Sequence, residues 1–125
     1  MPVISNAQTS GHQFAGVSFF PLAAPHLGSR ENAVWRIKIP AGSIAETAHQ
    51  LSREEILVVV CGAAVATIDG SGHQVAPGDT IILPAFTDFR LDNPGDTDFE
   101  AIVVLPAGGH ALLPGQRPFM PLWTC

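Results

Sequence analysis

Turn-forming residues interrupt this chain at short intervals and constrain its fold more than any other feature. Proline fixes its own φ and glycine readily adopts positive φ, so clusters of the two reverse the chain. The sequence contains eleven prolines and twelve glycines. Such clusters fall at residues 40–42, 61–62, 69–72, 77–79, 84–86 and 93–96. The pattern predicts many short strands joined by tight turns.

Between the turns lie short segments rich in valine, isoleucine, phenylalanine and threonine, the residues that strands favour. They span residues 14–20, 33–39, 55–61, 65–68, 80–83, 89–91 and 99–105. Within residues 34–39 apolar and basic side chains alternate, so Trp35 lies on one face of the strand and Arg36 on the other. Alternation alone leaves open which face lines a cavity. The segment lengths and spacing predict an all-β sandwich or barrel.

Residues 52–55 could instead begin a helix, because a serine followed three residues later by a glutamate forms a capping box. The residues that follow, 56–60, are mostly β-branched, and the run ends at Gly62. This composition favours a strand over a helix.

Length and charge exclude several classes of function. A chain of 125 residues has room for one domain with one core. The net charge is −5 and the basic residues are scattered, so we expect neither nucleic acid nor a membrane as a partner. The most apolar stretch, residues 56–66, is too short to span a bilayer as a helix. The N-terminus lacks the basic and apolar regions of a secretory signal, and Cys61 and Cys125 make no disulfide framework, so we expect a cytoplasmic protein.

Two motifs follow one another in the central part of the chain. In the first, the turn at residues 40–42 leads to His-Gln-Leu at residues 49–51, then to Glu55 and Gly62. In the second, Pro-Gly-Asp at residues 77–79 precedes an apolar strand and a Pro-Ala-Phe turn.

The second motif continues through Phe89 to Asn93. Together, and in this order, the two motifs resemble the conserved motifs of the cupin superfamily, and they cover about half of the chain. The resemblance implies one cupin domain over residues 1–125, an all-β barrel of the jelly-roll type with little or no helix. The strands that such a barrel needs lie within about residues 14–106.

The remaining C-terminal tail, residues 107–125, is rich in large apolar side chains. These are Leu112, Leu113, Phe119, Met120, Leu122 and Trp123. Because so much apolar surface is unfavourable in water, we expect the tail to pack on the barrel or on a second subunit. Cupins of this size commonly form dimers, so the resemblance also implies a homodimer.

The resemblance places the usual metal ligands of a cupin at positions 49, 51, 55 and 89. These positions hold His49, Leu51, Glu55 and Phe89, and neither leucine nor phenylalanine can donate an electron pair to a cation. Cys61 has the strand parity of Glu55 but would lie about 20 Å from it along the strand. The other four histidines fall in termini or turn-like sequence. We therefore expect no metal and no other cofactor.

In a cupin barrel, His49 and Glu55 would converge on one interior spot. Such a pair can move protons during isomerisation, cyclisation or dehydration, so we interpret the two residues as a candidate catalytic pair. Because buried charge is costly, we expect an ion pair or a shared-proton hydrogen bond between them. The candidate pocket residues around the pair are Trp35, Arg36, Leu51, Phe86, Phe89 and Arg90. Phe86 stands where a glycine is usual and should narrow the barrel mouth.

The sequence thus predicts a metal-independent cupin that acts on a small organic molecule, and an apolar wall suits a carbonyl-containing or polycyclic compound. Three alternatives stay open. His49 and Glu55 could be structural remnants of a metal site. The barrel could bind a small ligand without catalysis. The protein could also be a metal-dependent cupin oxygenase with an atypical ligand set.

Overall fold

The computed structural model describes residues 3–6 and 10–125. The prediction that the chain carries no secretory signal therefore falls partly outside the described residues. Within them, regular structure consists of strands and single turns of 3-10 helix. The strands are β1 (His12–Phe14), β2 (Val17–Ala23), β3 (Asn32–Ile39), β4 (Gln50–Leu51), β5 (Glu55–Cys61), β6 (Ala64–Ile68), β7 (Ser71–Val75), β8 (Thr80–Leu83), β9 (Phe89–Asp92), β10 (Phe99–Pro106) and β11 (Ala111–Leu112). The 3-10 turns are η2 (Pro25–Leu27) and η3 (Leu122–Thr124).

The predicted strands are found, with one correction and three additions. β5 and β8 have the predicted bounds, which confirms a strand rather than a helix after residue 54. The single strand predicted over residues 14–20 is wrong. Ala15 and Gly16 adopt φ values of 52° and 79°, so the chain reverses between β1 and β2. Sequence patterns missed β4, β7 and β11, because two are only two residues long and β7 is an exposed, largely polar edge strand.

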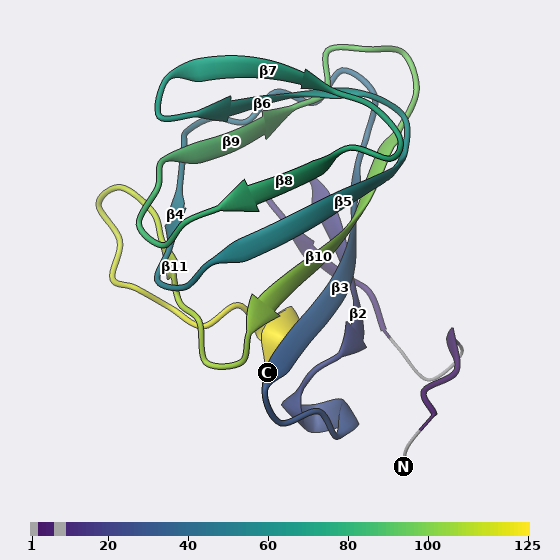
Figure 1. The fold of residues 1–125 in the computed structure, drawn as a ribbon, viewed down its shortest axis with the longest axis vertical. Coiled ribbons are helices and arrows are strands. Elements are labelled where there is room, and N and C mark those ends of the chain that lie inside the picture. Colours follow the sequence, from purple (N-terminus) through teal and green to yellow (C-terminus); the bar gives the residue numbers. More distant parts are fainter. Residues whose placement is uncertain (1–2, 7–9) are drawn as a thin grey trace.

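The strands form two facing layers of a jelly roll (Figure 1). One layer is a six-stranded sheet in the order β1-β2-β3-β10-β5-β8. The other combines a sheet in the order β7-β6-β9 with the pair β11-β4. A bridge between His49 and Phe89 joins β9 to the start of β4. The predicted all-β cupin-type fold is confirmed, although the ladders do not run without a break around the barrel.

The core lies between the layers, because alternate residues of each central strand point inward. β10 shows this most regularly, with Phe99, Ala101, Val103 and Leu105 almost completely buried. Asn93 is fully buried, and its amide donates to the backbone oxygens of residues 39, 40 and 97, which ties the turns at one end together. Gly62 is required nearby, since a Cβ there would lie 2.2 Å from the Asp98 carbonyl oxygen.

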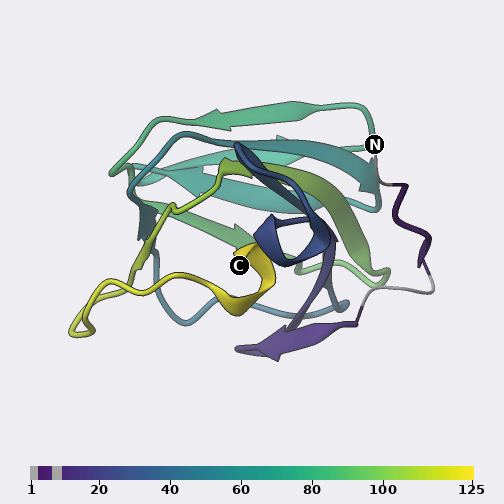
Figure 2. The same ribbon diagram turned by 90° about the horizontal axis from the view of Figure 1, so that it is seen from below.

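The two terminal segments lie together at one end of the molecule (Figures 1 and 2). Trp123 of η3 stacks on Phe19 of β2, with ring centroids 3.8 Å apart and planes inclined by 14°. The His26 amide donates to the Cys125 carbonyl oxygen over 2.8 Å. The C-terminal tail therefore packs against its own barrel.

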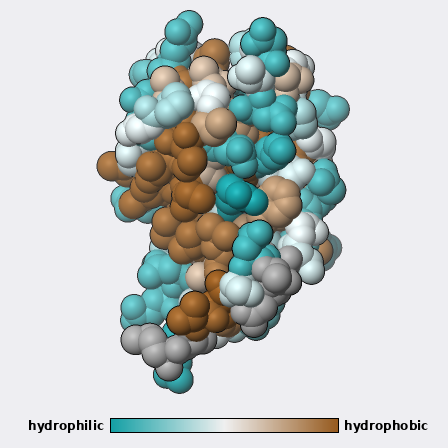
Figure 3. Space-filling view, turned by 90° about the vertical axis from the view of Figure 1, so that its right-hand side faces the viewer, coloured by the Kyte–Doolittle hydropathy of each residue, from teal (hydrophilic) through white to brown (hydrophobic). Residues whose placement is uncertain are grey.

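The outer face of the six-stranded sheet carries exposed apolar residues, among them Val58, Val60 and Ile82. Figure 3 shows apolar side chains gathered in a patch on the right-hand side of the molecule as drawn in Figure 1. No helix in residues 3–6 or 10–125 is long and apolar enough to cross a membrane.

Candidate functional site

A cavity of about 470 Å³ opens between the two layers. The inner face of β3 lines it with Trp35, Ile37 and Ile39, which answers the question that alternation left open. Leu57 of β5 and Val103 of β10 continue this apolar floor. The volume is in the range of pockets that enclose small organic ligands.

The polar groups at one end of the cavity, His49 and Glu55, come from the first motif of the sequence. We call this part of the cavity the polar end. Glu55 is the first residue of β5, is only 5% exposed, and pairs with Leu83 of β8 in the sheet. His49 precedes β4 and is held by two backbone hydrogen bonds of 2.9 Å to Phe89. Its ring also packs edge-on against the Phe89 ring, with centroids 5.7 Å apart. The backbone of Glu55 is thus fixed by β8 and that of His49 by β9.

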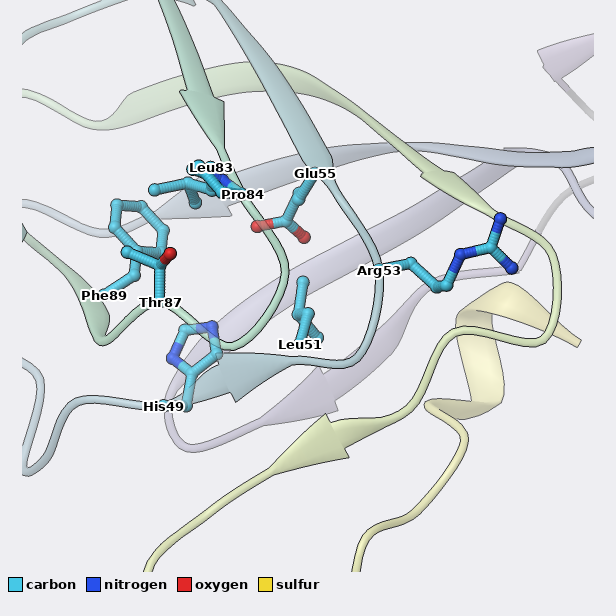
Figure 4. Close-up of a pocket in the computed structure, with 8 residues that line it drawn as sticks. All are labelled: His49, Leu51, Arg53, Glu55, Leu83, Pro84, Thr87 and Phe89. Atoms are coloured by element: carbon cyan, nitrogen blue, oxygen red, sulfur yellow. The ribbon is translucent and has the colours of Figure 1, made fainter.

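The carboxyl of Glu55 and the imidazole of His49 point into the same space, with Leu51 at one side (Figure 4). A hole of about 10 Å³ adjoins the cavity here and shares His49, Leu51, Glu55 and Phe89 with it. This is about the volume of one water molecule. Thr87 also lines the hole, whereas the Arg53 side chain points away from the other residues (Figure 4).

The expected direct contact between His49 and Glu55 is absent: over residues 3–6 and 10–125 the structure records no hydrogen bond or ion pair between them. Leu51 and Phe89 share the same end of the cavity. Without a charged partner, burial dominates. It raises the pKa of the Glu55 carboxyl from 4.5 to about 8 and lowers the pKa of the His49 imidazole below 6.5. At neutral pH the carboxyl is therefore mostly protonated and the imidazole is neutral.

Four of the six predicted pocket residues line the cavity, namely Trp35, Leu51, Phe89 and Arg90. The Arg90 Nε lies 3.1 Å from Asp92 Oδ2, and Asp92 in turn accepts the Ala45 amide over 2.8 Å. Arg90 is thus held at the cavity wall by an acidic neighbour on its own strand.

The predictions for Arg36 and Phe86 are wrong, since neither residue lines the cavity. Arg36 lies on the outer face of β3, where its guanidinium sits 5.0 Å from the centre of the Phe20 ring and its Nε 3.7 Å from Glu100. Phe86 adopts a φ of 59° and is 60% exposed, so its side chain faces solvent and does not narrow the mouth. Its amide donates to the Leu51 carbonyl oxygen over 2.8 Å.

Sequence reasoning missed a second group of lining residues, which come from the two terminal segments. Phe14 and Phe19 reach the cavity from β1 and β2, and Phe119 and Trp123 reach it from the C-terminal tail. The apolar character of the tail indicated that it would be buried. Nothing in the local sequence indicated that it would lie across the cavity.

The donor set does not fit a cupin metal. Of the four positions that the resemblance assigns to ligands, only His49 and Glu55 carry donor atoms, and Leu51 and Phe89 fill the other two. Within the part of the chain that the structure describes, no three His, Cys, Asp or Glu side chains are grouped so that they could hold a metal ion. One imidazole and one carboxyl would leave most of a coordination sphere to water.

Similar folds are found among solved structures. A cupin-superfamily sugar phosphate isomerase from Silicibacter pomeroyi matches 92% of this chain and 83% of its own, with a TM-score of 0.75 and 20% identity. The polyketide cyclase RemF from Streptomyces resistomycificus matches 98% of this chain and 88% of its own, with a TM-score of 0.75 and 18% identity. KdgF from Halomonas sp. matches 85% of this chain and 93% of its own, with a TM-score of 0.71 and 20% identity. At these identities the likeness concerns the fold alone.

The sequence itself matches the cupin domain family over residues 35–105, which is more than half of the chain. This segment begins at Trp35 in β3 and ends at Leu105 in β10, so it contains both motifs and the polar pair. The chain belongs to the cupin family.

Proposed function

We propose that the protein is a metal-independent enzyme that moves protons on a small carbonyl compound, with Glu55 and His49 as its acid and base. The observation that carries the proposal is the placement of the Glu55 carboxyl and the His49 imidazole in the same space at one end of an apolar cavity, without a hydrogen bond between them. The family and the names of similar structures, which include an isomerase and a cyclase, are consistent with such chemistry.

The shifted pKa values suit each group to its role. A protonated carboxyl can donate to a carbonyl oxygen, and a neutral imidazole can accept a proton from the adjacent carbon. In the proposed step His49 takes the α-proton, the C–H electrons form the new C=C bond, and the carbonyl oxygen takes the Glu55 proton. The product is an enol, with His49 protonated and Glu55 ionised. Return of the protons at another position isomerises the substrate, and loss of a leaving group or attack on a second carbonyl gives dehydration or cyclisation.

Exchange of α-protons for deuterium tests this step without knowledge of the natural substrate. Acetonaphthone, an aromatic methyl ketone, is incubated with the protein in D₂O, and loss of its methyl proton signal is followed by NMR. We expect exchange faster than in buffer, and loss of the acceleration in Glu55→Gln and His49→Gln. Glu54→Gln, which changes an exposed neighbour, is the matched control and should exchange at the native rate.

Other outcomes point to the two alternatives. A probe that raises the melting temperature but shows no catalysed exchange indicates a ligand-binding cupin without chemistry. About one transition metal per chain, found by elemental analysis of the purified protein, indicates an atypical metal-dependent cupin. Either result contradicts the proposal.

We also propose a homodimer that pairs the outer faces of the six-stranded sheets. The exposed row Val58, Val60 and Ile82 would be buried in such a pair. The basic residues on this face, Arg36 and Lys38, are already balanced by acidic neighbours on β10 and the turn before it, so two copies would not repel each other. Sedimentation equilibrium should give twice the mass of one chain for the native protein. The Val58→Lys variant should give the mass of a single chain. A native protein of single-chain mass contradicts the proposal.

A further inference from the structure

One wall of the cavity is formed by aromatic rings from the two terminal segments of the chain. The Phe14 ring centre lies 6.1 Å from that of Phe119 and 6.2 Å from that of Trp123, and Trp123 stacks on Phe19. We call these four residues the terminal wall. Phe14 is 40% exposed and lines the cavity, so its ring is accessible to an occupant.

The terminal wall and the polar pair have different origins in the chain. His49 and Glu55 lie inside the segment that matches the cupin family, residues 35–105. All four residues of the terminal wall lie outside it. The segments outside the family match therefore contribute four aromatic residues to the cavity lining.

Most of the aromatic residues of the chain line the cavity. The chain has seven phenylalanines and two tryptophans, and six of these nine line the cavity. Besides the terminal wall, these are Trp35 and Phe89. Aromatic rings in such numbers offer stacked and edge-on contacts to a flat ring system that a flexible aliphatic chain does not use.

The charges of the lining disfavour a phosphorylated sugar. Among the described residues that line the cavity, Arg90 is the one Lys or Arg side chain, and it is already paired with Asp92. Glu46 and Glu55 line the same cavity. A phosphate dianion would lose its hydration and meet one shared guanidinium and a nearby carboxylate at Glu46.

We propose that the terminal wall binds the flat face of an aromatic ring system, so that the substrate is an aromatic ketone or a related fused-ring carbonyl compound. The cavity volume, about 470 Å³, accommodates a molecule of this kind. With its rings against the terminal wall, the carbonyl group extends toward Glu55. This inference deepens the proposed function by naming the substrate class, and it rests on that function only for the direction of the carbonyl.

Binding of paired probes to the full chain tests the inference. Acetonaphthone and its saturated analogue acetyldecalin share a carbonyl and differ in aromaticity, and glucose phosphate represents the phosphorylated sugars. Isothermal titration calorimetry gives each Kd. Trp35 and Trp123 are the two tryptophans of the chain, and both line the cavity. Quenching of their fluorescence by a bound probe gives an independent measurement of binding. We expect acetonaphthone to bind at least tenfold more tightly than acetyldecalin and no binding of glucose phosphate.

Two variants remove a ring from the terminal wall while keeping an apolar side chain, namely Phe14→Leu and Phe119→Leu. Each should weaken acetonaphthone binding about tenfold and leave acetyldecalin binding unchanged. Phe86→Leu is the matched control, because Phe86 is exposed and lies outside the cavity, and it should bind acetonaphthone as the native protein does. Thermal melts of all variants check that they are folded; Phe14→Leu alters a half-exposed hairpin residue and supplies the test even if Phe119→Leu fails to fold.

Equal affinity for the aromatic and saturated ketones, or unchanged acetonaphthone binding in both wall variants, overturns the inference. Tight binding of glucose phosphate also overturns it. These results are distinct from failure of the proposed chemistry, which appears as unchanged proton exchange in Glu55→Gln while the wall variants still weaken binding.

Discussion

The two ends of the cavity are built in opposite ways. At the polar end, Glu55 begins β5 and pairs with Leu83 of β8, and His49 is bridged to Phe89 of β9, so both polar groups are held where burial is unfavourable for charge. The terminal wall, in contrast, is apolar, comes from the two terminal segments, and is stabilised by contacts between its own rings. The difference separates two tasks. In the proposed function, the polar end holds the reacting groups in place at a cost in stability, whereas the terminal wall adds stability and binds the substrate's rings.

The largest expected effect is on the proposed chemistry at the polar end. Glu55→Gln should slow catalysed proton exchange by about 10² to 10⁴-fold, the usual contribution of a general acid, because an amide cannot supply the proton. Binding of acetonaphthone, measured by calorimetry, should change by less than about threefold. A variant that loses binding and exchange in parallel would mean that Glu55 recognises the ligand rather than reacting with it.

The second expectation concerns stability, and it has a definite sign. The folded-state pKa of Glu55 is raised to about 8, so the unfolded chain releases this proton from about pH 4.5 while the folded protein retains it. The native free energy of unfolding therefore falls as pH rises from about 4.5 to 8. The Glu55→Gln variant lacks this loss. Its free energy of unfolding should therefore exceed that of the native protein by about 4 kcal/mol at pH 8 and by little at pH 4.5. Urea titrations at the two pH values measure the difference; an equal effect at both contradicts the account.

His49 should act in the opposite direction. Its folded pKa is lowered, so the unfolded chain binds a proton below about pH 6.5 that the folded protein does not. Stability is then lost as pH falls below 6.5, and His49→Gln should remove part of this acid-side loss. The same urea titrations, extended to pH 5, check it.

At the terminal wall, the main expected effect is on the free energy of unfolding. Trp123→Ala removes a buried ring that stacks on Phe19 and should lower the free energy of unfolding by about 3 kcal/mol. Phe14→Ala, at a half-exposed position, should cost less than about 1 kcal/mol. Denaturant titrations compare the two. Equal losses would mean that the hairpin and the tail contribute alike, contrary to their burial.

The smallest expected effect separates the two ends kinetically. Phe119→Leu should raise the KM for acetonaphthone exchange about tenfold and leave kcat within about a factor of two, since the wall holds the rings in the ground state and the transition state alike. A fall in kcat with unchanged KM would assign Phe119 to the chemistry and break the comparison.

How far the sequence predicts each end follows from the range of the contacts involved. The placement of His49 and Glu55 at one spot is what the resemblance of the two motifs to those of the cupins implies. The absence of a bond between them depends on side-chain directions, which no local pattern contains. The meeting of Phe14 with Phe119 joins residues at opposite ends of the chain, and only the complete fold brings them together.

The two wrong pocket residues show a related point. Alternation places Trp35 and Arg36 on opposite faces of β3, so once Trp35 faces the cavity, Arg36 must face outward. The prediction for Phe86 depends on its size at a position where glycine is usual in cupins. The positive φ at that position, which explains the preference for glycine, also turns the side chain to solvent.

We expect Glu55 to keep its proton at neutral pH in a site without a metal. Infrared difference spectra of the native protein minus Glu55→Gln, recorded from pH 5 to pH 10, measure that proton through the carbonyl stretch of the acid. We predict an acid band that persists at pH 7 and disappears around pH 8. A carboxylate band already present at pH 6 would contradict the account.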